Sequence, residues 1–165
     1  MKAKDINFNP NDLFTYSDGD LYWKINKGRA QKDCKAGFIQ HGYIQTMVSG
    51  KYYCNHRLIW QMFNGTIPDG MMIDHIDGNP ANNHIDNLRI ATRNQNQHNR
   101  KINKNNTSGV KGVTWHKSMN CWQAQIQANN QKRHLGYFNN VEDAKIVIDA
   151  ARLQSHGEFS NYGVN

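Results

Sequence analysis

The chain has 165 residues, enough for one domain or two small ones, and its apolar content of 38% supports small hydrophobic cores. The formal net charge of +7 suggests a polyanionic partner, and no run of 18 apolar residues provides a membrane-spanning helix. The first residues lack the apolar stretch of a signal peptide, and the three cysteines are far apart, so we expect an intracellular protein without a structural zinc knot.

The first half of the chain has the pattern of short strands followed by one helix. Turn residues separate five expected strands: LFTY, DLYWKI, GFIQ, YIQTMV and KYYC. The apolar spacing in NHRLIWQMF then predicts a helix over 55–63, ended by Gly65. We expect four aromatic residues here to belong to the core: Trp23, Tyr52, Tyr53 and Trp60.

A second strand pair with a helix after it is expected around residues 71–101. MMIDH and NLRIAT read as two strands, and RNQNQHNRK reads as a helix with Thr92 as its N-cap. The polar, aperiodic residues 102–108 then predict a linker between a first domain, 1–101, and a second, 109–165.

The second domain is expected to contain three strands and one helix. VKGVTWH, CWQAQIQA and KRHLGYF alternate as strands do, and Asn140 is a candidate N-cap for a helix that Gly157 ends. The whole chain is therefore predicted to be α+β, with N-terminal β-hairpins, a ββα unit, and a small three-stranded antiparallel sheet with a helix.

Positive charge is concentrated between residues 87 and 141. This stretch lacks Asp and Glu, and the rest of the chain has 11 basic and 13 acidic residues. A solvated basic face is one interpretation, and a surface for a polyanion is the one we favour. The stretch contains nine basic residues: Arg89, Arg93, Arg100, Lys101, Lys104, Lys111, Lys117, Lys132 and Arg133.

The segment IDHIDGNPANNHIDNLRIAT, from Ile73 to Thr92, combines residues that bind metals with residues that move protons. Asp74 and His75 are adjacent at the end of a strand, so their side chains point to opposite faces. Asn96 follows one turn into the next helix. Carboxylate and amide oxygens suit Mg²⁺ or Mn²⁺, and a neutral His beside them can take a proton from water.

This segment, extended to IDHIDGNPANNHIDNLRIATRNQNQHN, resembles the HNH nuclease motif in the form found in phage homing endonucleases. The resemblance implies that His75 is the general base and that Asp74 binds the metal. It also implies that Asn87 is the central motif residue, which braces the loop. Asn96 stands at the third motif position, where many members of the family have His, and the resemblance makes it the second metal ligand. The asparagine favours an oxygen-ligated Mg²⁺ site, with Mn²⁺ as the alternative, over a zinc site.

Other residues of the segment keep two interpretations each. Asp77 is either a turn cap, which we favour, or a second carboxylate ligand. Asn99 shares a helical face with Asn96 and is a reserve ligand, whereas His98 lies off that face. His84 either contacts phosphate or is simply exposed. The remaining asparagines are expected to pin the loop: Asn79, Asn82 and Asn83.

The stretch from Ser108 to about Gly163 resembles an AP2 DNA-binding domain, through GVTW, WQAQI, LGYF, EDAKIVIDAA and HGEF. The resemblance implies that the three-stranded sheet enters the DNA major groove. Residues on the outer face of this sheet are candidate DNA contacts: Lys111, Thr114, His116, Lys117, Gln123, Gln125, Lys132 and Arg133. The helix after the HNH motif adds Arg93, Arg100 and Lys101. Trp115 and Trp122 are either core or DNA-contacting residues.

Together these patterns predict a metal-dependent homing-type endonuclease that acts on double-stranded DNA, in the bacterial cytoplasm if a phage encodes it. A monomer with one site suits a nick, and symmetrical double-strand cuts would need a dimer. The alternative is a sequence-specific DNA-binding regulator with an inactive HNH scaffold. A structural zinc-binding module is a third interpretation, for which the sequence lacks ligands.

Overall fold

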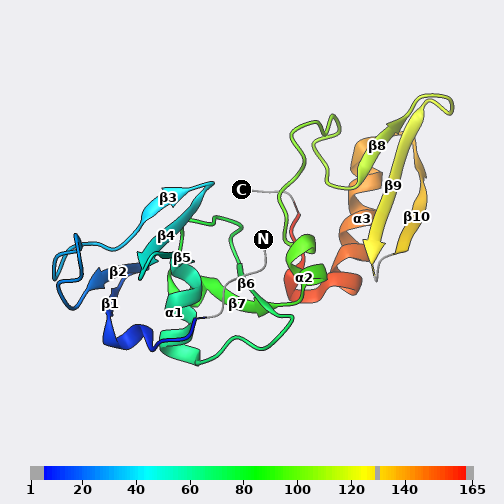
Figure 1. Ribbon diagram of the computed structural model, residues 1–165. Coiled ribbons are helices and arrows are strands. Elements are labelled where there is room, and N and C mark those ends of the chain that lie inside the picture. Colours follow the sequence, from blue (N-terminus) through cyan, green and yellow to red (C-terminus); the bar gives the residue numbers. More distant parts are fainter. Residues whose placement is uncertain (1–5, 129–130, 163–165) are drawn as a thin grey trace. The chain divides into compact units, whose positions relative to one another are not determined.

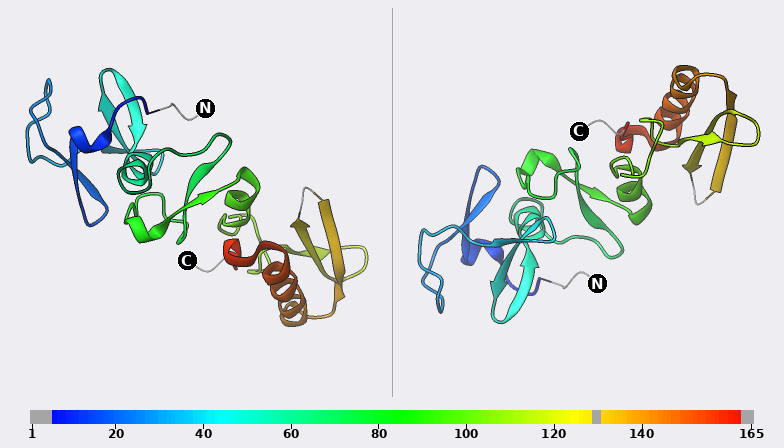
Figure 2. Two further views of the ribbon diagram at one scale, coloured as in Figure 1. Left: turned by 90° about the horizontal axis from the view of Figure 1, so that it is seen from below. Right: turned by 90° about the horizontal axis from the view of Figure 1, so that it is seen from above.

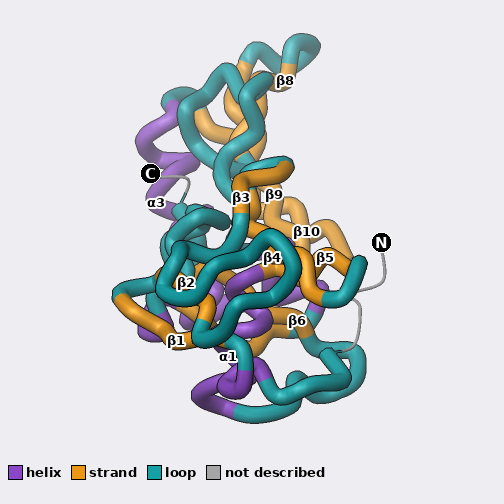
Figure 3. The backbone as a smooth tube through the Cα atoms, turned by 60° about the vertical axis from the view of Figure 1, so that its left-hand side comes forward, coloured by secondary structure: helices purple, strands orange, loops and turns teal. Residues whose placement is uncertain are grey.

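The computed structural model describes residues 6–128 and 131–162 of the chain (Figure 1). The chain forms two compact units, Met1–Ala91 and Thr92–Asn165. The first unit contains short strands joined by long loops around one helix (Figure 3). The second contains the three-stranded sheet and two helices. The predicted α+β class with small antiparallel sheets is confirmed.

Three hairpins of the first unit turn through a residue followed by glycine. Strands β1 (Phe14–Ser17) and β2 (Asp20–Trp23) pair across Asp18 and Gly19, both with positive φ. Strands β3 (Phe38–Gln40), β4 (Tyr43–Val48) and β5 (Lys51–Cys54) form a second sheet in that order. Its turns, His41–Gly42 and Ser49–Gly50, also have positive φ at both positions, as a two-residue hairpin requires.

Helix α1 (Asn55–Asn64) supplies the centre of the first core and ends at Gly65, as predicted. Leu58 and Ile59 are fully buried with Phe14 and Leu21, which come from the first hairpin. Fully burying a side chain of this size contributes roughly 1.5–3 kcal/mol. The packing therefore joins the hairpins to the helix.

Of the four aromatic residues predicted to lie in the core, three do so. Trp23 and Tyr53 are buried, and Trp60 is partly buried against the same cluster. The prediction for Tyr52 is wrong, because Tyr52 lies on the outer face of β5 and is 46% exposed. Its ring packs edge-on against Phe38 at 5.7 Å between centroids. Alternation places neighbouring residues of a strand on opposite faces, so Tyr52 and Tyr53 cannot both be buried in a sheet with one open face.

Strands β6 (Met72–His75) and β7 (Leu88–Ala91) form an antiparallel pair, as predicted. Helix α2 (Arg93–His98) follows, and Thr92 and Gln95 form a capping box at its start. The helix is three residues shorter than predicted, and it belongs to the second unit.

The second sheet has the order β10–β9–β8, with β8 (Val113–His116), β9 (Cys121–Ala128) and β10 (Gln131–Phe138) antiparallel. Helix α3 (Val141–His156) covers one face of this sheet (Figure 2). It begins at Asn140, whose side chain accepts from the backbone N–H of Asp143, and ends at Gly157, as predicted.

Alternation along β9 has the predicted sense, since Ala124 and Ile126 are buried whereas Gln123 and Gln125 are partly exposed. Trp122 packs on the second core, and Trp115 is 40% exposed and contacts Trp122 edge-on. The two tryptophans therefore differ in environment, whereas the sequence did not decide for either of them between a core and a DNA-contacting position.

Residues 102–108, predicted to be a linker, have no helix or strand and lie inside the second unit. Asn106 and Ser108 both bond the backbone carbonyls of Val110 and Val113. The end of this segment is therefore fixed to the start of β8. The functional domain limits 1–101 and 109–165 stay a prediction.

Candidate active site

Asp74 and His75 lie at the end of β6, where both side chains are buried. In the register of the β6–β7 pair, Asp74 faces Arg89 and His75 faces Leu88. Nε and Nη2 of Arg89 each donate to Oδ2 of Asp74 at 3.0 Å. Since both groups are almost completely removed from solvent, this ion pair fixes the carboxylate tightly.

His75 is held by a different partner. Its Nε2 lies 3.0 Å from Oδ1 of Asn83, which is fully buried. An amide oxygen only accepts, so Nε2 keeps its proton and donates to it. With the proton on Nε2, Nδ1 is the ring nitrogen that carries the lone pair in the neutral form of the ring. The strand end therefore presents a positioned proton acceptor next to a fixed carboxylate.

Asn87 braces the loop between β6 and β7, as the resemblance implied. Its Oδ1 accepts from the backbone N–H of Asp77, and its Nδ2 donates to Asp77 Oδ1 and to the carbonyl of Asn82. Asp77 also accepts from the backbone of Asn79 and from the side chain of Asn82. Burial alone would raise the pKa of Asp77, but these bonds from Asn79, Asn82 and Asn87 hold it below its ordinary value. This network makes Asp77 a turn cap, the interpretation that the sequence favoured.

His56, at the start of α1, packs against the proposed base. Its ring centroid is 4.9 Å from that of His75, and the ring of Tyr43 lies 5.6 Å from His56. Burial, followed by the charges of His75 and Arg57, lowers the pKa of His56 to about 3. His56 is therefore neutral at neutral pH and adds no charge beside His75.

Three contributors to this site were missed or only partly seen in the sequence. Arg89 was counted as a basic residue, and only the strand register pairs it with Asp74. Asn83 was expected to pin the loop, and in the structure it holds His75 itself. His56 lies in the helix predicted over 55–63, and nothing in the sequence indicated that it would contact His75. Each needs a tertiary contact that spacing along the chain does not reveal.

The donors expected to bind metal lie in different units. Asp74 belongs to the first, whereas Asn96 lies on α2 in the second, so their joint role stays a prediction. Asn99, the reserve ligand, is buried, and Nδ2 of Asn161 donates to its backbone carbonyl. No group of three or more His, Cys, Asp or Glu side chains suited to a metal occurs among the described residues. A site with one carboxylate and one amide would rely on water and phosphate oxygens, as Mg²⁺ sites commonly do.

The basic residues predicted to contact DNA have different environments. Six of them are exposed: Arg93, Arg100, Lys101, Lys117, Lys132 and Arg133. Lys111 is partly buried instead, and its Nζ donates to the carbonyls of His98 and Arg100. The register pairs Arg133 with buried Ile126, which places Arg133 on the helix side of the sheet, whereas Lys132 pairs with Gln127 on the outer side.

Thr114 and Gln123 also pair on the outer face of the sheet. Gln125 pairs with His134 there, and Nε2 of Gln123 lies 3.4 Å from Nδ1 of His134. His116 is partly buried and packs edge-on against Tyr137. The outer face of the sheet thus carries amides and imidazoles as well as cations.

Comparison with known proteins places this chain in a family. A family model described as HNH endonuclease matches residues 53–98, which include α1, the β6–β7 pair and α2. Protein 3.8 of Escherichia phage T7 is 39% identical over 107 residues, which are 65% of this chain and 88% of that protein. The chain belongs to the HNH endonuclease family.

Two further HNH relatives match over smaller parts of their own length. A putative HNH homing endonuclease, YosQ, from an SPbeta prophage of Bacillus subtilis is 39% identical over 73 residues, 44% of this chain and 42% of that protein. The uncharacterized HNH endonuclease L560 of Acanthamoeba polyphaga mimivirus is 32% identical over 106 residues, 64% of this chain and 54% of that protein.

A solved structure of DNA binding and cleavage by the HNH homing endonuclease I-HmuI is similar with a TM-score of 0.44 at 21% identity, covering 99% of this chain and 95% of that one.

No helix in the described part of the chain combines the length and apolar character needed to cross a membrane.

Proposed function

We propose that this HNH protein is a metal-dependent endonuclease of the homing type that cuts double-stranded DNA. The observation that carries the proposal is the pair of adjacent buried residues Asp74 and His75, each fixed by its own partner. A scaffold with no catalytic role has no need to hold an imidazole and a carboxylate in place separately. Membership of the HNH endonuclease family and the similarity to a putative homing endonuclease support the same reaction.

His75 is the general base in this proposal. With Nε2 donating to Asn83, Nδ1 accepts a proton from the water that attacks the phosphorus atom. Asn83 takes no part in the proton transfer. Its amide oxygen only holds the ring in its orientation. Neutral His56 packs against the ring, so the positive charge develops without an imidazolium neighbour. Asn87 acts through the loop and maintains the position of these groups.

Asp74 and Asn96 would hold the metal, Mg²⁺ in our proposal and Mn²⁺ as the alternative. A bound divalent cation would stabilise the negative charge on the 3′ oxygen as it leaves the phosphorus. Arg89 holds the carboxylate of Asp74 in place, because its Nε and Nη2 both contact Oδ2. The family resemblance implies products with 5′-phosphate and 3′-hydroxyl ends.

We assign DNA recognition to the AP2-like module, residues 109–165. Its three-stranded sheet has one face covered by α3 and an outer face with amides, imidazoles and cations. The segment from 87 to 141, which contributes all three strands, has no acidic residue. A sheet of this kind fits a major groove about 12 Å wide.

The experiment is to incubate the full chain with its source genome in Mg²⁺, in Mn²⁺ and in excess EDTA, and to map the ends on each strand. We expect discrete cuts that EDTA abolishes and that either metal restores. Asp74→Asn should remove cutting in both metals while DNA binding persists. Specific binding without cutting in any metal would instead establish the alternative, a DNA-binding regulator with an inactive HNH scaffold. The ends also distinguish a nick by a monomer from a double cut by a dimer.

A further inference from the structure

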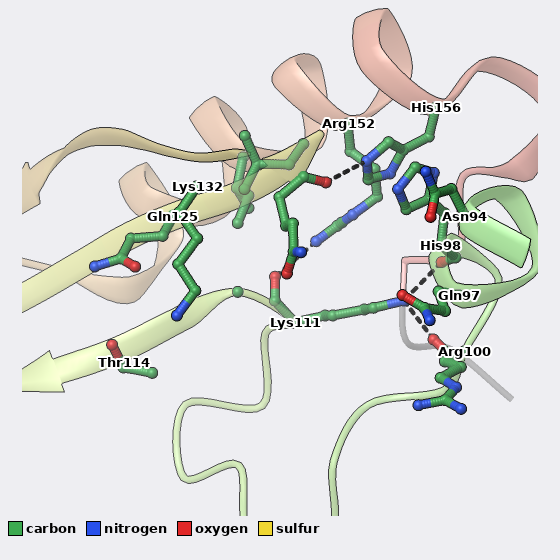
Figure 4. Close-up of a pocket in the computed structure, with 14 residues that line it drawn as sticks. Asn94, Gln97, His98, Arg100, Lys111, Thr114, Gln125, Lys132, Arg152 and His156 are labelled. Carbon is green, nitrogen blue, oxygen red and sulfur yellow. Dashed lines mark hydrogen bonds between the residues drawn. The ribbon is translucent and has the colours of Figure 1, made fainter. Parts of the chain in front are cut away.

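A cavity of about 380 Å³ lies within the second unit, between α2, the sheet and α3 (Figure 4). Its size is in the range of small-molecule sites. Four cationic side chains line it: Arg100, Lys111, Lys132 and Arg152. No carboxylate of the described residues is among those that line it.

Two of the cations that line this cavity, Lys111 and Arg152, bond to backbone carbonyls. Nζ of Lys111 crosses to α2 and donates to the carbonyl of His98 at 2.8 Å and to the carbonyl of Arg100 (Figure 4). Arg152, which is 3% exposed, donates to the carbonyl of Lys111 at 2.6 Å and to Asp149 at 2.7 Å. Asp149 is the anion that Arg152 bonds, and it is not among the described residues that line the cavity.

The surplus of positive charge affects the groups that titrate here. Burial, then the charges of Arg152 and Arg100, lowers the pKa of Lys111 to about 8. Burial also lowers the pKa of His156, and the charges of Arg152 and Lys111 lower it further. The region therefore resists additional positive charge, and a bound anion would relieve the repulsion.

The remaining walls suit a ligand larger than a simple halide. Ile126 and Ile148 give apolar surface, and the imidazoles of His98 and His156 stack at 3.6 Å between centroids. Side chains of Gln125 and Gln127 add hydrogen-bonding groups. A cavity lined by several cations and by apolar surface, with no carboxylate among the described lining residues, has the features that recognise a phosphate group with part of the molecule that bears it.

We propose that this cavity binds the phosphate group of a nucleotide, with Arg100, Lys111 and Lys132 as the cations that contact it. Two sources share this chemistry: a backbone phosphate of DNA and the phosphate of a free nucleotide. If the phosphate belongs to DNA, the inference rests on the proposed function. It then assigns a contact with a backbone phosphate to the part of the β8–β9–β10 sheet that lines the cavity. Arg152 is a positioning residue, since it fixes the backbone of Lys111.

The test uses the full chain in EDTA, with two double variants of equal charge. Arg100→Gln with Lys132→Gln removes two exposed cations of the cavity, and Arg29→Gln with Lys32→Gln removes two exposed cations of the first unit. Inorganic phosphate and thymidine 5′-monophosphate are titrated at constant ionic strength. The signals are the backbone amides of Gly112 and Gln127 in ¹H–¹⁵N spectra, which also show that each variant is folded.

Wild type and the control variant should show saturable shifts at Gly112 and Gln127. The cavity variant should bind phosphate and the mononucleotide at least about tenfold more weakly. Equal affinity of the two double variants, or no shift at these amides, would overturn the proposal. A duplex that shifts the same amides and is displaced by phosphate identifies the backbone as the source. A mononucleotide that shifts them while a duplex does not identifies a free nucleotide.

The outcome is separate from that of the proposed function. Phosphate binding in a chain that never cuts DNA would remove the nuclease assignment and leave the cavity assignment in place. Metal-dependent cutting by a chain whose cavity binds neither phosphate nor mononucleotide would do the reverse.

Discussion

His75 and Asp74 are neighbours in the chain but are controlled by different residues. Asn83 fixes the imidazole of His75 through Nε2, and Arg89 fixes the carboxylate of Asp74 through two N–H groups. Strand alternation makes this possible, because it sends adjacent side chains in opposite directions. The two functions of the site can therefore be removed one at a time.

Replacing the proposed base tests the first of these functions. His75→Ala should lower kcat by about 10²–10⁴, the usual contribution of a positioned acid–base group. Affinity for DNA should stay near that of the unchanged protein, because the ring is buried in the first unit. Single-turnover cleavage and a binding titration measure the two quantities. His84→Ala, a substitution in the same loop, is the control, and a His75→Ala protein that cuts at the rate of this control would exclude the assignment.

Replacing Asn83 tests how the base is held. Asn83→Ala leaves His75 without the acceptor at Nε2, so the ring loses its orientation and its fixed tautomer. We expect kcat to fall by about tenfold or more while KM changes little. Asn83→Asp supplies an acceptor at the same place and should recover part of the rate. If neither substitution changes kcat, the contact between Asn83 and His75 is only structural.

His56 gives the first unit a dependence on pH. Its pKa when folded is about 3, below the ordinary value of 6.5, so folding favours the neutral ring. The contribution of the neutral His56 ring to the free energy of unfolding is fully present above pH about 6.5. It is lost as the pH falls toward 3, by up to roughly 1.4 kcal/mol per pH unit. His56→Phe should flatten this slope in denaturant titrations, whereas His41→Asn, in an exposed turn, should keep it. Equal slopes in the two variants would contradict the prediction.

At the scale of elements, the turns and caps were predictable because their chemistry is local. Asp18–Gly19 and His41–Gly42 have the positive φ values that two-residue hairpins need, and Asn140 caps α3 through its own side chain. The exposure of Tyr52 and the membership of α2 in the second unit were not predictable in this way. They depend on which sheet face is covered and on bonds such as Lys111 to His98, between residues far apart in sequence.

The β6–β7 loop is an element whose stability depends on one asparagine. Asn87→Ala removes three hydrogen bonds, to the backbone of Asp77, the carboxylate of Asp77 and the carbonyl of Asn82. We expect a loss of about 1–3 kcal/mol in the free energy of unfolding, since the bonds lie near the surface. Asp86→Ala, one residue away, should cost much less. Thermal unfolding of both variants is the measurement, and equal melting temperatures would show that the loop does not need this brace.

At the scale of the whole molecule, charge and hydrogen-bonding groups are unevenly distributed along the chain. All nine basic residues between 87 and 141 occur without an acidic neighbour in that stretch, while the rest of the chain is slightly acidic. Each cation that meets a backbone phosphate releases counterions without reading the sequence. The amides on the outer face of the second sheet, such as Gln123, are the groups able to distinguish bases.

This division predicts different effects of two substitutions in the second unit. Lys117→Ala, at an exposed position after β8, should weaken binding to all duplexes alike and flatten the plot of log affinity against log salt by about one unit. Gln123→Ala, on the outer face of β9, should keep the salt slope and lose roughly 1–3 kcal/mol of discrimination at one or two base pairs. Titrations on target and scrambled duplexes at several salt concentrations separate the two effects. If Gln123→Ala discriminates between these duplexes as well as the unchanged chain does, the outer face of the sheet serves only as an electrostatic anchor and specificity comes from elsewhere in the chain.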